Sequence, residues 1–396
     1  MTGDLFPGPA FEPTPEAAAA RLAAVRPGEY ARTRNHLQGA VTRLSPYIAH
    51  GFLTLPEVLA GVLQRQRLDV QHKFVYELGW REYFHHVWAH EGEGILGSLH
   101  QGPLPDAAYA RELPPDLREG RTGVPAVDAA VRELYATGWL HNHARMWVAS
   151  YTVHLRKVHW RAGADWMFAH LLDGDLASNH LSWQWVAGTG SHKPYLFNAG
   201  NVARYAPPAW HSPGTAIDRG YEALDAIARS PRAVAGGLPA DDGVAEPTLQ
   251  PGPGEAFKSA DPEAVRGRGV WIVHPWLLRG APTGLPREVL RVGIVIAPWH
   301  ARHRWSARRW DFVTARMQAC CDLLWAGEPT AIADALRNAS SIDGHDDPHL
   351  AGALSDFDLP CPPRLFAWPP QRCRSFSQFW QRVAPREGDA PALLGM

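Results

Sequence analysis

The chain has 396 residues, of which 45% are apolar, and its formal net charge at pH 7 is −1. This length suggests two or three domains with enough apolar side chains for packed cores, and no run of about 18 apolar residues exists to span a membrane. The near-zero charge excludes a globally basic nucleic-acid-binding protein and leaves only a local basic groove for such a partner.

The N-terminus and the cysteines predict a cytoplasmic protein with reduced thiols. The first 15 residues lack the basic flank and apolar centre of a signal peptide. No CxxC pair and no histidine at zinc spacing accompanies the cysteines, so we expect no metal at Cys320, Cys321, Cys361 or Cys373. An iron–sulfur cluster would need all four to converge, which an adjacent Cys–Cys pair makes awkward.

Helical periodicity opens the chain, and helices are predicted at residues 15–25, 56–68 and 74–90. In the last of these, Glu77, Trp80 and Arg81 occupy positions i, i+3 and i+4, so they share one face. They form either a surface Glu–Arg pair beside a half-buried indole or the wall of a ligand site, where the indole stacks on a planar ring.

A polar loop lies between the first two helices. Residues 30–35, YARTRN, lead into residues 41–47, VTRLSPY, directly before a helix. Threonine, serine and arginine at such a position can present hydroxyls and amides to a phosphate. Most segments of this kind are helix caps, so the loop alone does not decide between a phosphate-binding site and a helix cap.

The chain is organised around residues 121–186. Their periodicity predicts three or four closely spaced helices, one over residues 125–138 that stops at Gly138 and another from His141 to about Arg156. Their inner faces carry tryptophans and the polar residues Arg145, Asp173, Asp175 and Asn179. Buried polar groups of this kind require a polar ligand.

The second half of the chain has a different character. Proline and glycine are dense after Ala206, and residues 211–264 are predicted to be a linker or a mobile loop. Residues 269–278 and 291–299 are short apolar, β-branched runs that are typical of buried strands. A helix at about residues 309–326 and a second shorter one would complete a small α/β domain.

Five motifs follow one another in the first 210 residues: TRLSPYIAHGFL, ELGWREYF, EGRTGVPAVDAA, GWLHNHARM and DGDLASNHLSWQW. Their order and spacing resemble the flavin-binding helical domain of the DNA photolyase and cryptochrome family. The resemblance implies a multidomain fold. An all-α domain over residues 1–210 would hold FAD in a folded, U-shaped conformation, and a linker over residues 211–264 would lead to a small α/β domain over residues 265–396 with a C-terminal tail.

The resemblance assigns part of the chain to the cofactor's phosphates. The residues that resemble the phosphate-binding loop are Tyr30, Thr42, Leu44 and Ser45. Arg81 resembles the cationic contact to the cofactor. Val41 stands where family members usually have threonine or serine, so one hydroxyl contact is lost.

Four further residues resemble those beside the flavin ring. Arg145 and Asp173 look like the ion pair next to the isoalloxazine, Asp175 like a hydrogen-bond acceptor at its polar edge, and Asn179 like the residue that faces N5. This assignment fits the chemistry, because a flavin anion needs a cation and its N3–H needs an acceptor. An unpaired buried arginine would cost roughly 3–5 kcal/mol.

A second set resembles the pocket of photolyases that split cyclobutane pyrimidine dimers: Glu77, Trp80, Asn142, Met146 and Trp185. Photolyases of the (6-4) lesion carry histidines where this chain has Asn142 and Met146, so the cyclobutane substrate in UV-damaged DNA is favoured. Flipping the lesion out of the duplex costs a few kcal/mol. Stacking on Trp80 and Trp185 would offset about 1–3 kcal/mol per base.

On this resemblance, the chain is a lyase that repairs DNA with light. Photoexcited reduced FAD would donate an electron to the dimer and recover it after the ring opens, with Glu77 and Asn142 among the catalytic residues. Trp160 and Trp183 match two of the three tryptophans through which many family members reduce FAD. The stretch where the third belongs, residues 106–120, contains no tryptophan, and Trp139 and Tyr109 are unranked candidates.

The order of the domains departs from the family pattern. Family members normally carry an α/β antenna domain before the flavin domain, whereas here the linker-like motif SFSQFWQRV lies at residues 375–383. We hypothesise a circularly permuted, shortened antenna-like domain at residues 265–365, since spatially close termini permit such a rearrangement. Its strand order would test the hypothesis, and whether it holds a second chromophore cannot be read from the sequence.

Two alternatives remain. A cryptochrome-like photoreceptor would keep the same pocket without repair, and the neutral charge and atypical second half favour it, whereas the complete set of lesion-pocket residues favours repair. A degenerate relative would serve another role, such as RNA or protein binding. In each case we expect a cytoplasmic monomer without a membrane segment.

Overall fold

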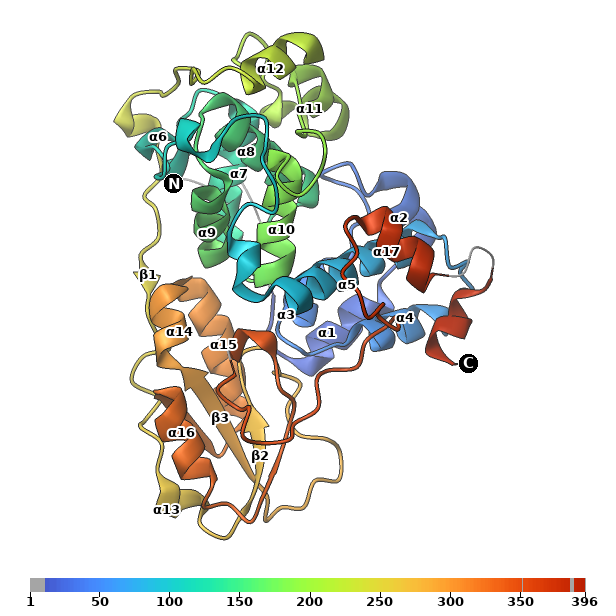
Figure 1. Cartoon of the computed structure of the whole chain (residues 1–396), viewed down its shortest axis with the longest axis vertical. Helices are drawn as coiled ribbons and strands as arrows, with labels where there is room; N and C mark the ends of the chain where they lie inside the picture. Colours follow the sequence, from blue (N-terminus) through green and yellow to red (C-terminus); the bar gives the residue numbers. More distant parts are fainter. Residues whose placement is uncertain (1–10, 351, 385–387, 396) are drawn as a thin grey trace.

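The computed structural model describes residues 11–350, 352–384 and 388–395, and the helical and the sheet-containing parts of the chain are distinct (Figure 1). The helices of the first part are α1 (Pro15–Ala23), α2 (Pro27–Thr33), α3 (Ser45–Ala49), α4 (Leu55–Leu63), α5 (Lys73–Glu91), α6 (Pro115–Arg118), α7 (Pro125–Thr137), α8 (Asn142–Ser150), α9 (Trp160–His170), α10 (Leu176–Ala187), α11 (Ala199–Tyr205) and α12 (Tyr221–Ala228). A π-helical turn, Tyr151–Leu155, follows α8 directly.

The helix ends follow local chemistry that the sequence displays. Thr54 and Glu57 form a reciprocal capping box at the start of α4. Gly138 ends α7 in the left-handed conformation that glycine tolerates best. The side chain of Asp175 caps α10 by accepting a hydrogen bond from the backbone N–H of Ser178. The predicted helices at residues 15–25, 56–68 and 74–90 therefore differ from α1, α4 and α5 mainly in where they end.

Helix α10 lies at the centre of the helical part and packs against α9, α5 and α8. Its inner face carries the buried Trp183, whose ring lies over Gly163 of α9. A Cβ at residue 163 would approach that ring to 2.3 Å, so only glycine allows this close helix contact.

The second part is a four-stranded parallel sheet in the spatial order β5-β3-β2-β6. Its elements are α13 (Pro262–Val265), β2 (Gly269–Val273), β3 (Leu290–Ile296), α14 (Ala297–Arg302), β4 (Trp305–Ser306), α15 (Ala307–Cys320), β5 (Leu323–Gly327), α16 (Pro329–Leu336) and β6 (Ser341–Asp343). If these four strands are numbered 1 to 4 along the chain, their spatial order across the sheet is 3-2-1-4. The first four strands of a doubly wound sheet have the same order.

The prediction of one helix over residues 309–326 was wrong at its C-terminal end. Helix α15 stops at Cys320, and Leu323–Gly327 form the edge strand β5 beside β3. The run LLWA is short and apolar, and such a run has no periodicity that separates a strand from the end of a helix. Pairing with β3 decides its conformation.

The predicted linker contains an ordered helix. Within residues 211–264, α12 packs against the π-helical turn, and β1 (Leu249–Gln250) pairs with β4. The Nζ of the buried Lys157 donates hydrogen bonds to the carbonyls of Ile227 and Ala228, which lie at the C-terminal end of α12. The last carbonyls of a helix lack partners within the helix, and this lysine supplies them.

The C-terminal segment belongs to the helical part rather than to the predicted α/β domain over residues 265–396. Helix α17 (Phe376–Val383) lies beside α5 (Figure 1). The buried carboxylate of Glu82 accepts a hydrogen bond from the backbone N–H of Leu365, and His86 accepts one from the backbone N–H of Cys373. The reason is aromatic packing, because the ring of Phe376 stacks on Trp80 at 4.0 Å with an interplanar angle of 8°.

None of the helices within the described ranges combines the length and the apolar character that crossing a membrane requires.

The packing of α17 on α5 predicts the effect of Gly79→Ala. The new Cβ would lie 2.4 Å from the ring of Trp380, so it should push α17 away and cost about 1–3 kcal/mol, more than the helix propensity gained. Thermal unfolding and limited proteolysis of the C-terminal segment measure this. Gly28→Ala is the control because no atom lies within 4 Å of its Cβ, and equal protease resistance of both variants would contradict the docking.

Candidate functional site

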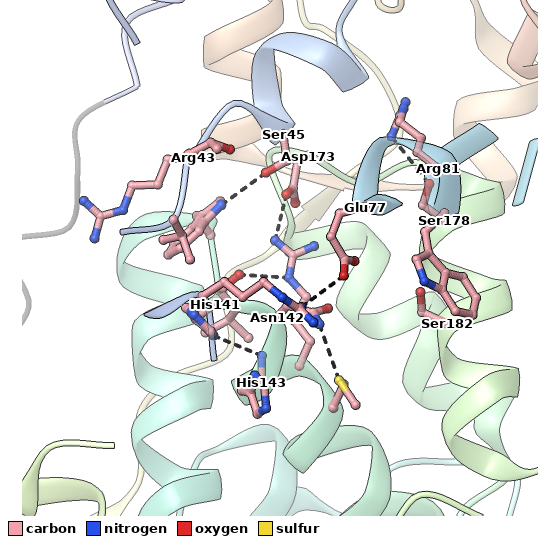
Figure 2. Close-up of a pocket in the computed structure, with 18 of the residues that line it drawn as sticks. Arg43, Ser45, Glu77, Arg81, His141, Asn142, His143, Asp173, Ser178 and Ser182 are labelled. Atoms are coloured by element: carbon pink, nitrogen blue, oxygen red, sulfur yellow. Dashed lines mark hydrogen bonds and ion pairs between the residues drawn. The ribbon is translucent and has the colours of Figure 1, made fainter. Parts of the chain in front are cut away.

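A cavity of about 550 Å³ opens between α2, the loop before α3, α5, α8 and α10. Figure 2 shows His141 and Asn142 at the start of α8 on one side, Ser178 and Ser182 of α10 on the other, and Glu77 of α5 pointing between them. A volume in this range suits a cofactor or another small organic ligand.

Most of the residues predicted from the sequence line this cavity. Those at its wall are Tyr30, Thr42, Ser45, Glu77, Trp80, Arg81, Asn142, Arg145, Met146, Asp173 and Trp185. Leu44, Asp175, Asn179, Trp160 and Trp183 do not line it. The structure thus places the predicted cofactor residues and the predicted lesion residues around one shared space.

An ion pair forms the polar floor of the cavity. The Nη2 of Arg145 lies 2.7 Å from Oδ2 of Asp173, and its Nε donates a hydrogen bond of 2.9 Å to the carbonyl of Leu140. The Asp173 side chain is 2% exposed, and its other oxygen, Oδ1, is buried without a partner among the described residues. A buried acceptor without a donor is costly, so this atom fits a guest that carries N–H or O–H groups, as FAD does.

The loop before α3 turns sharply at the cavity edge. Arg43 adopts a φ of 51°, which is uncommon for a residue with a side chain, and its guanidinium lies 5.3 Å from the ring centroid of Trp139. The indole N–H of Trp139 donates to the hydroxyl of Ser45, and the backbone N–H of Leu44 donates to the hydroxyl of Thr42. The side chain of Leu44 is buried, so only its backbone could face a ligand.

Glu77 is paired with an arginine that the sequence reading did not identify. Its carboxylate lies 3.1 Å from Nη1 of Arg34, the C-cap residue of α2. Burial raises the pKa of Glu77, and Arg34 and Lys73 offset this in part. A carboxyl group in this condition can keep a proton and donate a hydrogen bond nearer neutral pH than a solvated glutamate can. Tyr30 and Arg34 are one helical turn apart, and this spacing could have indicated that both side chains face the same site.

Asp175 lies behind the cavity, not at its wall, which does not support its predicted place at the polar edge of the flavin. One oxygen accepts from the backbone N–H of Ser178, and the other is 3.1 Å from Arg81 and 2.9 Å from His85. Burial by itself would raise the pKa of Asp175, but Arg81 and His85 hold it well below its ordinary value. The aspartate that lines the cavity and has an unpartnered oxygen is instead Asp173.

Asn179 is also turned away from the cavity wall. Its side-chain amide donates a hydrogen bond of 2.8 Å to the carbonyl of Ala164 on α9. The amide thus ties α10 to α9, and its predicted position opposite a flavin N5 stays a prediction.

Two half-buried indoles line the cavity, as predicted for a lesion pocket. Trp80 lies against Phe376 of α17, and Trp185 lies 5.8 Å from the ring of Tyr195. The side-chain amide of Asn142 is 3.4 Å from Sδ of Met146 one turn further along α8. Each indole therefore has a fixed support and a side that faces the cavity.

Two serines and a histidine also line the cavity, and none of them was predicted from the sequence as a site residue. Ser178 and Ser182 lie one turn apart on α10, in register with Trp185, a spacing that could have revealed them. His141 caps α8 through its Nδ1, while its Nε2 is buried without a partner among the described residues. Burial lowers the pKa of His141 to about 3, so its ring is neutral.

Trp183 and Trp160 are buried beside the cavity, and the rings near Trp160 rank the two candidates for a third relay member. His159 lies 5.6 Å from Trp160, and Tyr109 lies 6.3 Å from His159. Trp139, by contrast, lines the cavity beside Ser45. Of the two candidates, Tyr109 is thus the one that a neighbouring ring, His159, connects to Trp160.

Residues 74–209 match the family model of the FAD binding domain of DNA photolyase. This part of the chain is therefore similar to the FAD-binding domain of photolyases. The orphaned acceptor of Asp173 and the Arg145 pair fit that cofactor, which Tyr30, Thr42, Ser45 and Arg81 would also help to hold.

Relatives named photolyase and relatives named cryptochrome both match this part of the chain. A deoxyribodipyrimidine photo-lyase of Thermus thermophilus is 40% identical over 193 residues, which cover 46% of this chain and 44% of the relative. Cryptochrome-1 of Arabidopsis thaliana is 35% identical over 178 residues, covering 41% and 25%. The solved Synechocystis cryptochrome is 30% identical with a TM-score of 0.44, covering 50% of this chain and 44% of that one. The chain thus spans less than half the length of these relatives.

The Arg81–Asp175–His85 network predicts a pH dependence of stability. Because the pKa of Asp175 is depressed in the folded state, its carboxylate contributes stability above about pH 4, and this contribution is lost as the pH falls through the folded value. Asp175→Asn keeps a capping oxygen but removes the charge. It should lower the free energy of unfolding at pH 7 by about 2–3 kcal/mol and flatten its fall below pH 5.

Urea unfolding between pH 7 and pH 3 measures this effect. Asp311→Asn, which removes an exposed carboxylate of α15, is the control and should leave the curve unchanged. An equally steep acid loss in Asp175→Asn would assign the acid sensitivity to other groups.

Proposed function

We propose that the protein repairs cyclobutane pyrimidine dimers in DNA by light-driven electron transfer from reduced FAD. The observation that carries this proposal is that one cavity joins the Arg145–Asp173 pair to two indole walls and a half-buried glutamate. A ligand site for FAD alone would not need Trp80 and Trp185 on the same space. UV-damaged DNA is the partner that this combination favours.

The chain's own residues would bind and orient the lesion. Trp80 and Trp185 offer ring faces for stacking on flipped bases, and Phe376 and Tyr195 support them from behind. Glu77 would form a hydrogen bond with the bases of the lesion while Arg34 fixes its position. Asn142 and Met146 close the same side of the cavity.

The chemistry that bound FAD supplies is the donation and recovery of an electron under light. Arg145 would balance negative charge at the cofactor, and the unpartnered oxygen of Asp173 would accept one of its hydrogen bonds. Trp183 and Trp160 would carry electrons between the cavity and the surface, with Tyr109 as the outer member.

We also propose that the domain predicted over residues 265–365 is antenna-like and permuted. Its support is the parallel order β5-β3-β2-β6, which a doubly wound domain shares. Ligands of such sheets bind beyond the carboxyl ends of the strands, and here these ends face the helical part.

A cryptochrome-like photoreceptor is the second candidate, and one contact favours it. Phe376 of the C-terminal helix stacks directly on Trp80 of the cavity wall. A change at the cavity would therefore reach α17, which a receptor could use for output without repair.

The deciding measurement is the loss of dimers from an irradiated oligonucleotide under blue light, with FAD chemically reduced beforehand. We expect light-dependent repair by the wild type. Trp185→Ala should weaken binding of damaged DNA about tenfold to a hundredfold through lost stacking while FAD stays bound. Tyr221→Ala, an exposed aromatic on α12, is the control.

Two results would contradict this assignment. Wild-type protein with full FAD and no repair would favour the photoreceptor. Loss of FAD from Trp185→Ala would place this indole on the cofactor side.

The ring positions predict that Tyr109→Phe slows photoreduction of oxidised FAD, because phenylalanine lacks the phenol that can be oxidised. Repair by chemically reduced protein should not change. Trp139→Phe should leave the photoreduction rate intact, and transient absorption measures both variants. The reverse result would assign the outer position to Trp139.

A further inference from the structure

Arg309 reaches from the α/β domain into the loop that carries Asp173. It lies on α15, and its side chain is completely buried. Its Nη1 donates a hydrogen bond of 3.2 Å to the carbonyl of Phe168, and its Nη2 donates one of 2.5 Å to the carbonyl of Gly174. The two parts of the chain therefore meet at one guanidinium.

The surroundings of this guanidinium are unusual for a buried cation. It lies 3.7 Å from the ring centroid of Trp305 and 4.8 Å from that of Phe168. Its Nε has no hydrogen-bond partner among the described residues, and both of its hydrogen bonds are to backbone carbonyls. Burial lowers the pKa of Arg309, and the charges of Asp173 and Asp175 raise it. The positive charge is thus held close to two buried carboxylates without pairing directly with either.

Gly174 makes room for the guanidinium. A Cβ at this position would lie 2.4 Å from Nη1 of Arg309 and 2.7 Å from the carbonyl oxygen of Phe168. The glycine between the two aspartates therefore allows close approach of Arg309, and its backbone carbonyl is the acceptor.

A second side chain ties the same loop to the α/β domain. The ring of the buried His50 lies with Nε2 2.7 Å from the carbonyl of Leu172 and Nδ1 2.6 Å from the carbonyl of Pro275. Burial lowers the pKa of His50 to about 3, so its ring is neutral and donates to one of these two carbonyls. A side chain thus lies against the carbonyl on each side of Asp173. The loop over residues 171–175 has little freedom to turn the carboxylate away from the cavity.

We propose that Arg309 is a positioning residue of the FAD site, through which the α/β domain sets the affinity and the reduction potential of the bound flavin. By holding the loop, it keeps Asp173 at the cavity wall, and its charge stabilises added negative charge there. This inference rests on the proposed function in one respect, the placement of Asp173 beside the flavin.

The test compares Arg309→Met and Arg309→Lys with the control Arg308→Met, an exposed neighbour on α15. We expect Arg309→Met to raise the dissociation constant of FAD at least tenfold and to shift the midpoint potential of the flavin to a more negative value. Arg309→Lys, which keeps the charge, should restore the potential but only part of the affinity. Fluorescence titration and spectroelectrochemistry measure these, and circular dichroism monitors folding.

A double mutant separates positioning from mere stabilisation. In an Asp173→Asn background, Arg309→Met should raise the dissociation constant of FAD much less, because the carboxylate that Arg309 positions is gone, whereas the effect of its charge on the potential should remain. Additive losses of affinity, or unchanged affinity and potential in folded Arg309→Met, would overturn the inference. If Arg309→Met does not fold, Gly174→Ala tests the same contact from the loop side and should raise the FAD dissociation constant likewise.

The failures of the two proposals are distinguishable. Wild-type protein that binds FAD but does not repair dimers would refute the repair function and leave the Arg309 measurements valid. Wild-type protein that binds no FAD would overturn both.

Discussion

Two nearly fully buried carboxylates, two residues apart in the loop between α9 and α10, set the conditions for the rest of the structure. Each must have a cation, because an unpaired buried charge costs several kcal/mol. Arg145 of α8 pairs with Asp173, and Arg81 of α5 pairs with Asp175. Helices that are distant in the sequence are thereby brought to one loop, and the space that remains between them is the cavity.

The pairing is unequal, and this inequality is chemically useful. Both oxygens of Asp175 have partners, so this residue holds α5 and α10 together. Asp173 lines the cavity and keeps one buried oxygen without a partner among the described residues. The first carboxylate is therefore structural, whereas the second is left to bind a guest.

Segments from the far end of the chain complete the same site. Helix α17 supports Trp80, and α15 sends Arg309 to the backbone of the aspartate loop. The flavin-binding motifs occupy the first part of the chain, yet their geometry depends on packing from the second part. This dependence explains why the α/β domain and the C-terminal segment differ in sequence character but share one buried aromatic cluster with the helices.

The sequence by itself determined the helices with clear periodicity and caps, the order of the motifs and most of the cavity residues. Those residues could be predicted because they lie in short segments whose local spacing survives folding, as with Glu77, Trp80 and Arg81 on one face of α5. Only the tertiary structure decided that Asp175 faces away from the cavity, that Arg34 pairs with Glu77, and that LLWA is a strand. Each of these features depends on a partner from another element, and so does the contact of Arg309 on α15 with the aspartate loop. Neither periodicity nor composition encodes which distant side chain will satisfy a buried charge or which strand will pair with an open sheet edge.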